Sequence, residues 1–212
     1  MATLYYYPSN ASMAPHMVLE EIGAPFELHR VDRESNAHKS PAYLRLNPNG
    51  AIPTYVDGDL VLFEAAAICL HLADTNPAAA LAPPLGSAER AQFYKWLIHL
   101  TNTVQAELLT YFYPERLAED SVAATVVKAH AETRLGEMFD RIEAALAAGG
   151  PYLLGARFSA ADLYLLMVAR WTRGMKNPAR NRPALRRLLD RLIERPAVNR
   201  AFATEKITAP LF

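Results

Sequence analysis

The chain has 212 residues, 51% of them apolar, and its 22 lysines and arginines balance 22 acidic residues. This length can bury a real core, and a net charge of zero gives no general attraction to nucleic acid or to an anionic membrane. The single cysteine, Cys69, excludes an internal disulfide, and because the N-terminus lacks the basic and apolar regions of a signal peptide we expect a cytoplasmic protein.

The first 76 residues alternate short patterns typical of strands and of helices. The expected strands cover residues 3–7, 26–31, 53–56 and 60–63, and the expected helices cover residues 13–22 and 65–73. Pro8 ends the first strand, Gly23 ends the first helix, and Asp57-Gly58-Asp59 is a hairpin signal between the last two strands. This order predicts a small mixed sheet with helices packed on it.

A proline-rich segment separates this part from a region in which every pattern is helical. We interpret residues 77–88 as a linker between a domain of residues 1–76 and a domain of residues 89–212. In the second domain, apolar residues at spacings of three and four predict helices over residues 89–113, 122–146, 184–193 and 197–203. Ser159 and Asp162 in RFSAADLYLL form a capping-box pattern, which predicts one more helix start.

The sequence carries no signature of a metal site or of a nucleic-acid surface. The six histidines have neither HxxxH nor HxH spacing, so we expect no metal. Residues 170–200 are rich in arginine, but aromatic side chains that could stack on bases are nearly absent there. We therefore interpret this region as solvated helix faces.

The stretch YYYPSNASMAPH places Ser9, Asn10 and Ser12 between the first strand and the first helix. Short polar side chains at such a junction either cap the helix or bind a ligand. Capping by Ser12 is weakened because Pro15, at the third helical position, has no N–H, although the hydroxyl could still accept the N–H of Ala14. The residues by themselves leave both interpretations open.

Four segments in this order resemble the cytosolic glutathione transferase family, and most closely its bacterial, beta-like members: YYYPSNASMAPHMVLEEIG, NPNGAIPTYVDG, FEAAAICLHLAD and RFSAAD. The resemblance implies the glutathione transferase fold, which is an α/β thioredoxin-like N-terminal domain plus an all-α C-terminal domain, and a homodimer. It also implies a glutathione S-transferase with glutathione as co-substrate. Such an enzyme binds glutathione as thiolate and conjugates it to small apolar electrophiles in an open pocket between the domains, or reduces them with it.

The resemblance also implies which residues bind glutathione. Pro53 matches the family's cis-proline, which exposes the backbone of Ile52 to an extended tripeptide, although it could simply start a strand. Glu64 matches the group that holds the γ-glutamyl ammonium, although it could be a plain first-turn acid. Ala65 departs from the family's Ser or Thr, so only its amide could bind the α-carboxylate, and we expect weaker binding unless something compensates.

Further glutathione contacts are implied for five polar residues. His38 and Lys39 lie where the family places a cation against the glycine carboxylate, but either could be a solvated loop charge. Asn102 and Thr103 match positions that reach glutathione across the dimer interface. Gln105 stands where beta-like members have an active-site histidine. The alternative for these three is an ordinary solvated helix face.

Transferase chemistry needs the glutathione thiol as thiolate, because the thiolate is the nucleophile. Ser12 matches the family's serine after the first strand, Asn10 could donate to the same sulfur, and Tyr6 falls where other branches have a catalytic tyrosine. Ala11 replaces the cysteine of the beta-like pattern, which excludes a mixed disulfide there and favours a noncovalent mechanism. Ala11 and Ala65 also support an alternative function, a catalytically weak binding or interaction module with the same fold.

Overall fold

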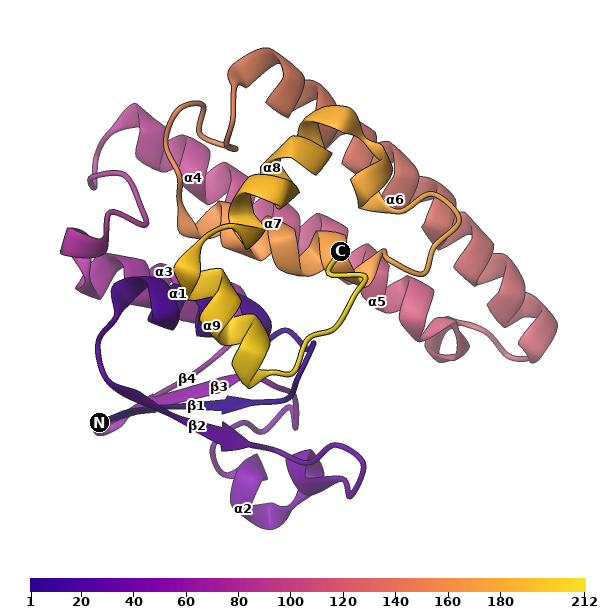
Figure 1. The fold of residues 1–212 in the computed structure, drawn as a ribbon. Coiled ribbons are helices and arrows are strands. Elements are labelled where there is room, and N and C mark those ends of the chain that lie inside the picture. Colours follow the sequence, from indigo (N-terminus) through magenta and orange to yellow (C-terminus); the bar gives the residue numbers. More distant parts are fainter. The chain divides into compact units, whose positions relative to one another are not determined.

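The computed structural model describes all residues 1–212 (Figure 1). They form two compact units, one of Met1–Ala82 with Ile193–Ala209 and the other of Pro83–Leu192 with Pro210–Phe212. The first unit therefore contains residues 193–209, which the sequence assigned to the helical domain. None of the helices has the length and apolar character that crossing a membrane requires.

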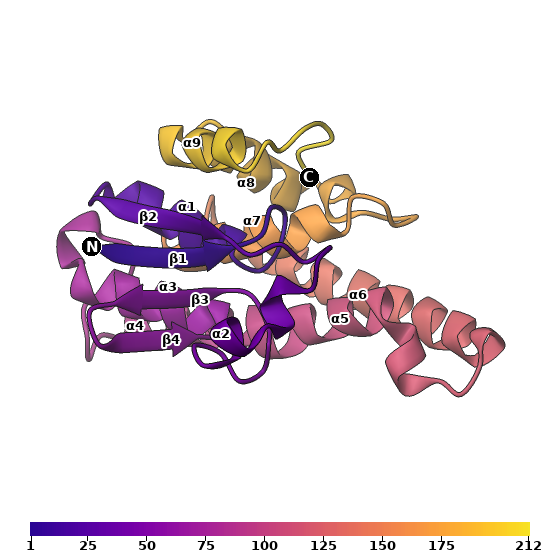
Figure 2. The ribbon, with the colours of Figure 1, turned by 90° about the horizontal axis from the view of Figure 1, so that it is seen from below.

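The first unit is built on a four-stranded sheet of order β2-β1-β3-β4, seen side by side in Figure 2. The strands are β1 (Ala2–Tyr6), β2 (Phe26–Arg30), β3 (Thr54–Asp57) and β4 (Leu60–Phe63). β1 runs parallel to β2, whereas β1–β3 and β3–β4 are antiparallel pairs. The helical elements are α1 (Met13–Ile22), 3-10 helix η1 (Ala37–Lys39), α2 (Pro41–Leu44), α3 (Ala65–Thr75), 3-10 helix η2 (Pro77–Ala79) and α9 (Pro196–Thr204).

Local signals account for the ends of these elements. α1 covers the predicted residues and ends at Gly23, whose φ of 72° is left-handed and whose N–H donates to the carbonyl of Leu19. Gly58, with φ of 57°, makes the tight turn between β3 and β4. Met13, Met17 and other apolar residues of α1 are fully buried, and α1 packs against α3 and α9. The predicted mixed sheet with packed helices is confirmed.

The second unit is helical. Its elements are α4 (Ala88–His99), the π-helical turn η3 (Leu100–Gln105), α5 (Ala106–Phe112), 3-10 helix η4 (Pro114–Leu117), α6 (Ser121–Gly149), α7 (Ala160–Trp171), 3-10 helix η5 (Ala179–Asn181) and α8 (Pro183–Ile193). The continuous helix predicted over residues 89–113 is thus interrupted by a π turn. The hydroxyl of buried Tyr164 forms hydrogen bonds with Thr101 and Gln105, which both belong to that turn.

The capping box predicted at the start of α7 is formed by Ser159 and Asp162, and both residues are fully buried. The Asp162 carboxylate accepts the N–H of Leu153 and the N–H of Ser159, each at 2.8 Å. Burial raises the pKa of Asp162 to about 6, although these hydrogen bonds act in the opposite direction. The helix start therefore rests on one desolvated carboxyl group.

Candidate functional site

The strand register brings three segments to the same end of the sheet. Tyr5 pairs with Thr54, and Thr54 pairs with Phe63. The loop after β1, the residues before β3 and the residues after β4 therefore leave the sheet side by side. These segments carry most of the residues that the sequence proposed for glutathione and for the thiol, so the topology supports their grouping.

Ile52 and Pro53 lie just before β3 and are joined by a cis peptide bond, as the resemblance implied. Ile52 precedes the first ladder pair of β3, so its N–H and C=O remain outside the sheet ladder. Its neighbour Ala51 is held firmly, because the carbonyl of Ala51 accepts the Tyr43 hydroxyl at 2.7 Å and the Asn47 amide at 2.9 Å. The segment offers a rigid, unpaired edge to an extended peptide.

Glu64 joins β4 to α3 in an unusual backbone conformation, with φ of 72° and ψ of 111°. Residues other than glycine adopt such angles only when the surroundings impose them. Its carboxylate is exposed and bonds to no group of the chain. α3 starts at Ala65 with no side-chain cap, so its first amides and the helix dipole can accept an anion. A carboxylate thus stands directly before a helix N-terminus that has no side-chain cap.

His38 and Lys39 lie in η1, next to the turn that leads to Ile52. Lys39 Nζ donates to the carbonyl of Asn49 at 3.2 Å. Gly50, with φ of 56°, leaves room for Lys39, since a Cβ there would lie 2.7 Å from Nζ. Burial, followed by the charges of Arg33 and Lys39, lowers the pKa of His38. Of the two candidates, Lys39 carries the firmer positive charge.

Ser12 occupies the N-cap position of α1, but its side chain caps no helical N–H. The fully buried hydroxyl instead donates to the carbonyl of Tyr7 at 3.1 Å and accepts the N–H of Tyr7 at 3.2 Å. Capping through the hydroxyl, one of the two interpretations left open above, is therefore wrong. Because a serine has a single hydroxyl proton, the bond to Tyr7 competes with any donation to a thiol.

Asn10 and Tyr6 are arranged differently. Asn10 Oδ1 accepts the N–H of Ala11 at 2.6 Å, which leaves the NH₂ group of Asn10 free to donate elsewhere. The Tyr6 side chain is half-buried, and its ring lies 6.1 Å from the ring of His16. Asn10 therefore combines partial exposure with an uncommitted side-chain donor group, and it lies closer along the chain to the start of α1 than Tyr6 does.

Asn102, Thr103 and Gln105 belong to η3 in the second unit. Asn102 is exposed and Thr103 is half-buried, so both side chains can reach solvent. The Gln105 side-chain oxygen accepts the hydroxyl of buried Tyr164, which holds that amide in place. The polar cluster is therefore partly structural, and this tie to Tyr164 has no signal in the local sequence.

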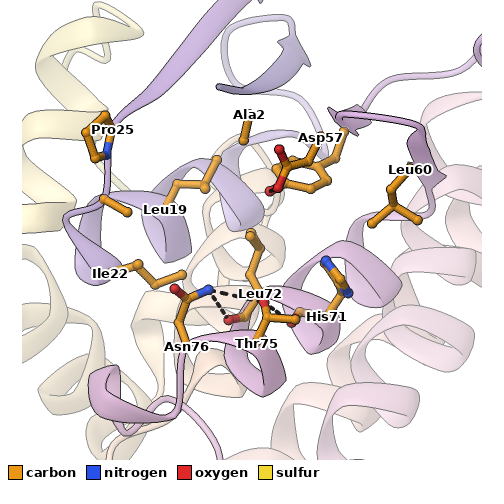
Figure 3. A pocket seen from close by; sticks show the side chains of 12 residues that line it. Ala2, Leu19, Ile22, Pro25, Asp57, Leu60, His71, Leu72, Thr75 and Asn76 are labelled. Carbon is orange, nitrogen blue, oxygen red and sulfur yellow. Dashed lines mark hydrogen bonds between the residues drawn. The ribbon is translucent and has the colours of Figure 1, made fainter.

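A pocket of about 450 Å³ lies elsewhere on the first unit (Figure 3). Its walls come from the C-terminal ends of α1 and α3, from the β3–β4 hairpin and from the start of β1, for example Ile22, Asn76 and Leu60. None of the predicted glutathione residues lines it. The N-terminal ends of the same two helices carry the candidate site, so the pocket is at the opposite end of both helices.

Three residues that support the site were not found from the sequence. Tyr43 and Asn47 fix Ala51, and Glu205 accepts the N–H of Ser9 at 2.9 Å. Asn47 belongs to the NPNG motif, so its buried amide had a sequence signal. Glu205 had none, because it lies 196 positions from Ser9.

Comparison with known proteins gives consistent matches. Residues 1–74 match the family described as "Glutathione S-transferase, N-terminal domain", and residues 115–200 match "Glutathione S-transferase, C-terminal domain". Glutathione S-transferase GST-4.5 of Xanthomonas campestris pv. campestris is 37% identical over 175 residues, 79% of this chain and 81% of that protein. A Methylococcus capsulatus glutathione transferase structure is 34% identical with a TM-score of 0.86, covering 98% of this chain and 100% of that one. A sphingomonad glutathione S-transferase complexed with glutathione is 31% identical with a TM-score of 0.84, covering 97% and 100%.

Proposed function

Because the chain belongs to the glutathione S-transferase family and is a glutathione transferase, we propose that it binds glutathione at the end of the sheet that carries Ile52, Glu64 and Asn10. The observation that carries the proposal is the unpaired backbone of Ile52, at the same end of the sheet as the uncapped start of α3. Such an edge pairs with an extended tripeptide as a strand would.

Each charged group of glutathione then has a partner. The Glu64 carboxylate pairs with the γ-glutamyl ammonium, and its exposed position leaves it available. The α-carboxylate of the γ-glutamyl residue is bound by the amide of Ala65 at the N-terminus of α3. Lys39 and His38 face the glycine carboxylate, and Lys39 supplies the charge. A second set of contacts with glutathione is proposed for Asn102, Thr103 and Gln105.

A hydrogen-bond donor at the sulfur of glutathione would activate the thiol by stabilising the thiolate. We assign this role to the Asn10 amide, because the Ser12 proton is directed at Tyr7 and the Asn10 NH₂ group has no partner. Hydrogen bonding to a charged form favours it, and a bond worth about 1.5–3 kcal/mol lowers a thiol pKa by about one to two units. Ser12 and Tyr6 are the alternatives. Because Ala11 provides no sulfur, the thiolate of glutathione itself attacks the electrophile.

The second substrate is a small apolar electrophile, and the working form is a homodimer. The edge strand β4 supports the dimer, since Leu60, Val61 and Phe63 are 38%, 39% and 38% exposed. Apolar side chains on an edge strand are commonly covered by another chain. The cytoplasm is the proposed location, because it keeps glutathione reduced. Sedimentation at several protein concentrations tests the dimer.

Calorimetric titration with glutathione, combined with a conjugation assay on a chlorinated aromatic compound, tests the proposed function. We expect binding that displaces protons as the thiol ionises, and turnover that depends on glutathione. Ophthalmic acid, in which a methyl group replaces the thiol, is the matched ligand control, since it should bind without releasing a proton. Binding of glutathione without turnover on any electrophile would contradict the proposed chemistry, and no binding would contradict the site.

A further inference from the structure

A carboxylate at the end of α9 reaches the loop that carries the candidate thiol donors. Glu205 is 3% exposed, and its Oε2 accepts the N–H of Ser9 at 2.9 Å. Its Oε1 lies 2.8 Å from Nδ1 of His16, a fully buried residue of α1. Because an ionised carboxylate only accepts hydrogen bonds, Nδ1 of His16 is the donor in this pair. One side chain therefore ties the loop to α1.

The backbone on both sides of this contact is strained. Ser9 has φ of 58°, and Lys206, which follows Glu205, has φ of 55°. Residues other than glycine hold left-handed angles only when neighbouring contacts over-determine them. The bond from Ser9 to Glu205 joins the two strained turns directly. We therefore regard this bond as a contact that fixes the conformation of Ser9.

α9 is itself bound to α1 by two arginine–glutamate pairs, which fix the position of Glu205 at the end of α9 relative to α1. Arg195 donates from Nε and Nη2 to the two carboxylate oxygens of Glu21, at 2.5 and 2.9 Å. Arg200 donates from Nε to the Glu20 carboxylate at 2.5 Å and from Nη2 to the Glu20 carbonyl at 2.7 Å. Figure 1 shows α9 alongside α1, in agreement with their contacts. Bidentate pairs of this kind fix orientation as well as distance.

We infer that Glu205 is a positioning residue for thiol activation, which acts through Ser9 on the amide of Asn10. The inference rests on the proposed function. Asn10 follows Ser9 directly, and its own N–H donates to the carbonyl of Tyr7 at 3.2 Å. A change of backbone angles at Ser9 would turn the Asn10 side chain away from the sulfur. The binding groups at Ile52 and Glu64 lie on other segments and would be unaffected.

The test is an ultraviolet titration of the thiolate of bound glutathione in three variants. In Glu205→Ala we expect the thiol pKa to rise by about half a unit to one unit, and kcat near neutral pH to fall about threefold to tenfold. The KM for glutathione should stay nearly constant, and kcat should recover at alkaline pH. Glu205→Gln should restore most of the titration, since its side-chain oxygen can still accept the N–H of Ser9. Arg141→Ala, which removes an exposed ion pair with Glu137 on α6, should leave the titration unchanged.

A lower thermal stability of Glu205→Ala with an unchanged thiol titration would make Glu205 a purely structural residue and overturn the inference. If Glu205→Ala does not fold, Glu205→Asp provides the same comparison, because it keeps the charge but shortens the reach to Ser9. Faster amide hydrogen exchange at Ser9 and Asn10 in the variant would support it. A wild-type protein that leaves the thiol at its solution pKa would refute the proposed function itself, before any variant is made.

Discussion

Replacing Ser12 by alanine removes a fully buried hydroxyl that makes two hydrogen bonds with the backbone of Tyr7. The hydroxyl donates to the Tyr7 carbonyl at 3.1 Å and accepts the Tyr7 N–H at 3.2 Å. A buried group that loses its hydrogen-bond partner costs about 1–3 kcal/mol. The N–H of Tyr7 loses its partner, whereas its C=O still accepts the N–H of Asn10, so we expect Ser12→Ala to lower the free energy of unfolding by about 1–3 kcal/mol. Asn10→Ala removes one bond to its neighbour Ala11 and should cost below about 1 kcal/mol.

The effects of the two variants on the pKa of the bound thiol should have the opposite order to their effects on stability. With Asn10 as the donor, Asn10→Ala raises the pKa of bound glutathione by about one unit and lowers kcat near neutral pH about tenfold, with recovery at alkaline pH. Ser12→Ala should shift the thiol pKa less. Ultraviolet thiolate titration and denaturant unfolding on the same samples measure both effects. A thiol shift in Ser12→Ala with unchanged stability would refute this reasoning and make Ser12 the donor; a shift in neither variant would point to Tyr6 or to backbone amides.

Three further variants test other parts of the site and fold. Glu64→Gly should raise the free energy of unfolding by about 1 kcal/mol, because glycine adopts a φ of 72° without strain. The same variant should no longer be retained on a glutathione resin, since it lacks the carboxylate. Retention equal to that of the wild type would contradict the role of the carboxylate. Ala65→Ser should lower the KM for glutathione with little change in kcat, and a raised KM would mean that the α-carboxylate binds elsewhere. Burial raises the pKa of Asp162 from 3.8 to about 6, so the folded state takes up a proton before the unfolded state as the pH falls. Between about pH 7 and about pH 4, the free energy of unfolding of the wild type should therefore rise by about 2 kcal/mol relative to that of Asp162→Asn. Parallel profiles of stability against pH for the two proteins would contradict this.

Elements that depend on local signals were predictable from the sequence. The bounds of α1 follow from its apolar spacing and from Gly23, and the start of α7 follows from its capping box. The π turn at Leu100–Gln105 had no signal in the local apolar spacing, and its side-chain partner Tyr164 lies 59 positions from Gln105. Strand ends shifted by a residue for a related reason: ladder pairing between strands decides them, and not the residue pattern.

The candidate site divides in the same way. The resemblance to a known family identified the Ile52–Pro53 segment, and the cis bond there is confirmed. The partner of the Ser12 hydroxyl was not evident, since the same sequence position allows either a helix cap or a bond back to the strand. Nothing in the local sequence linked Ser9 to Glu205, because the contact depends on how the C-terminal helix packs on α1.

The positions where local sequence rules fail are themselves informative. Ser9 and Glu64 both adopt positive φ, where glycine would be unstrained, and both lie at the end of the sheet that carries Ile52. A glycine at Glu64 would remove the carboxylate that faces solvent beside the α3 N-terminus, whereas a glycine at Ser9 would loosen the turn that leads to Asn10. Under the proposed function the backbone strain at these two positions has a use, because one residue would keep a charge in place and the other would keep the donor loop rigid.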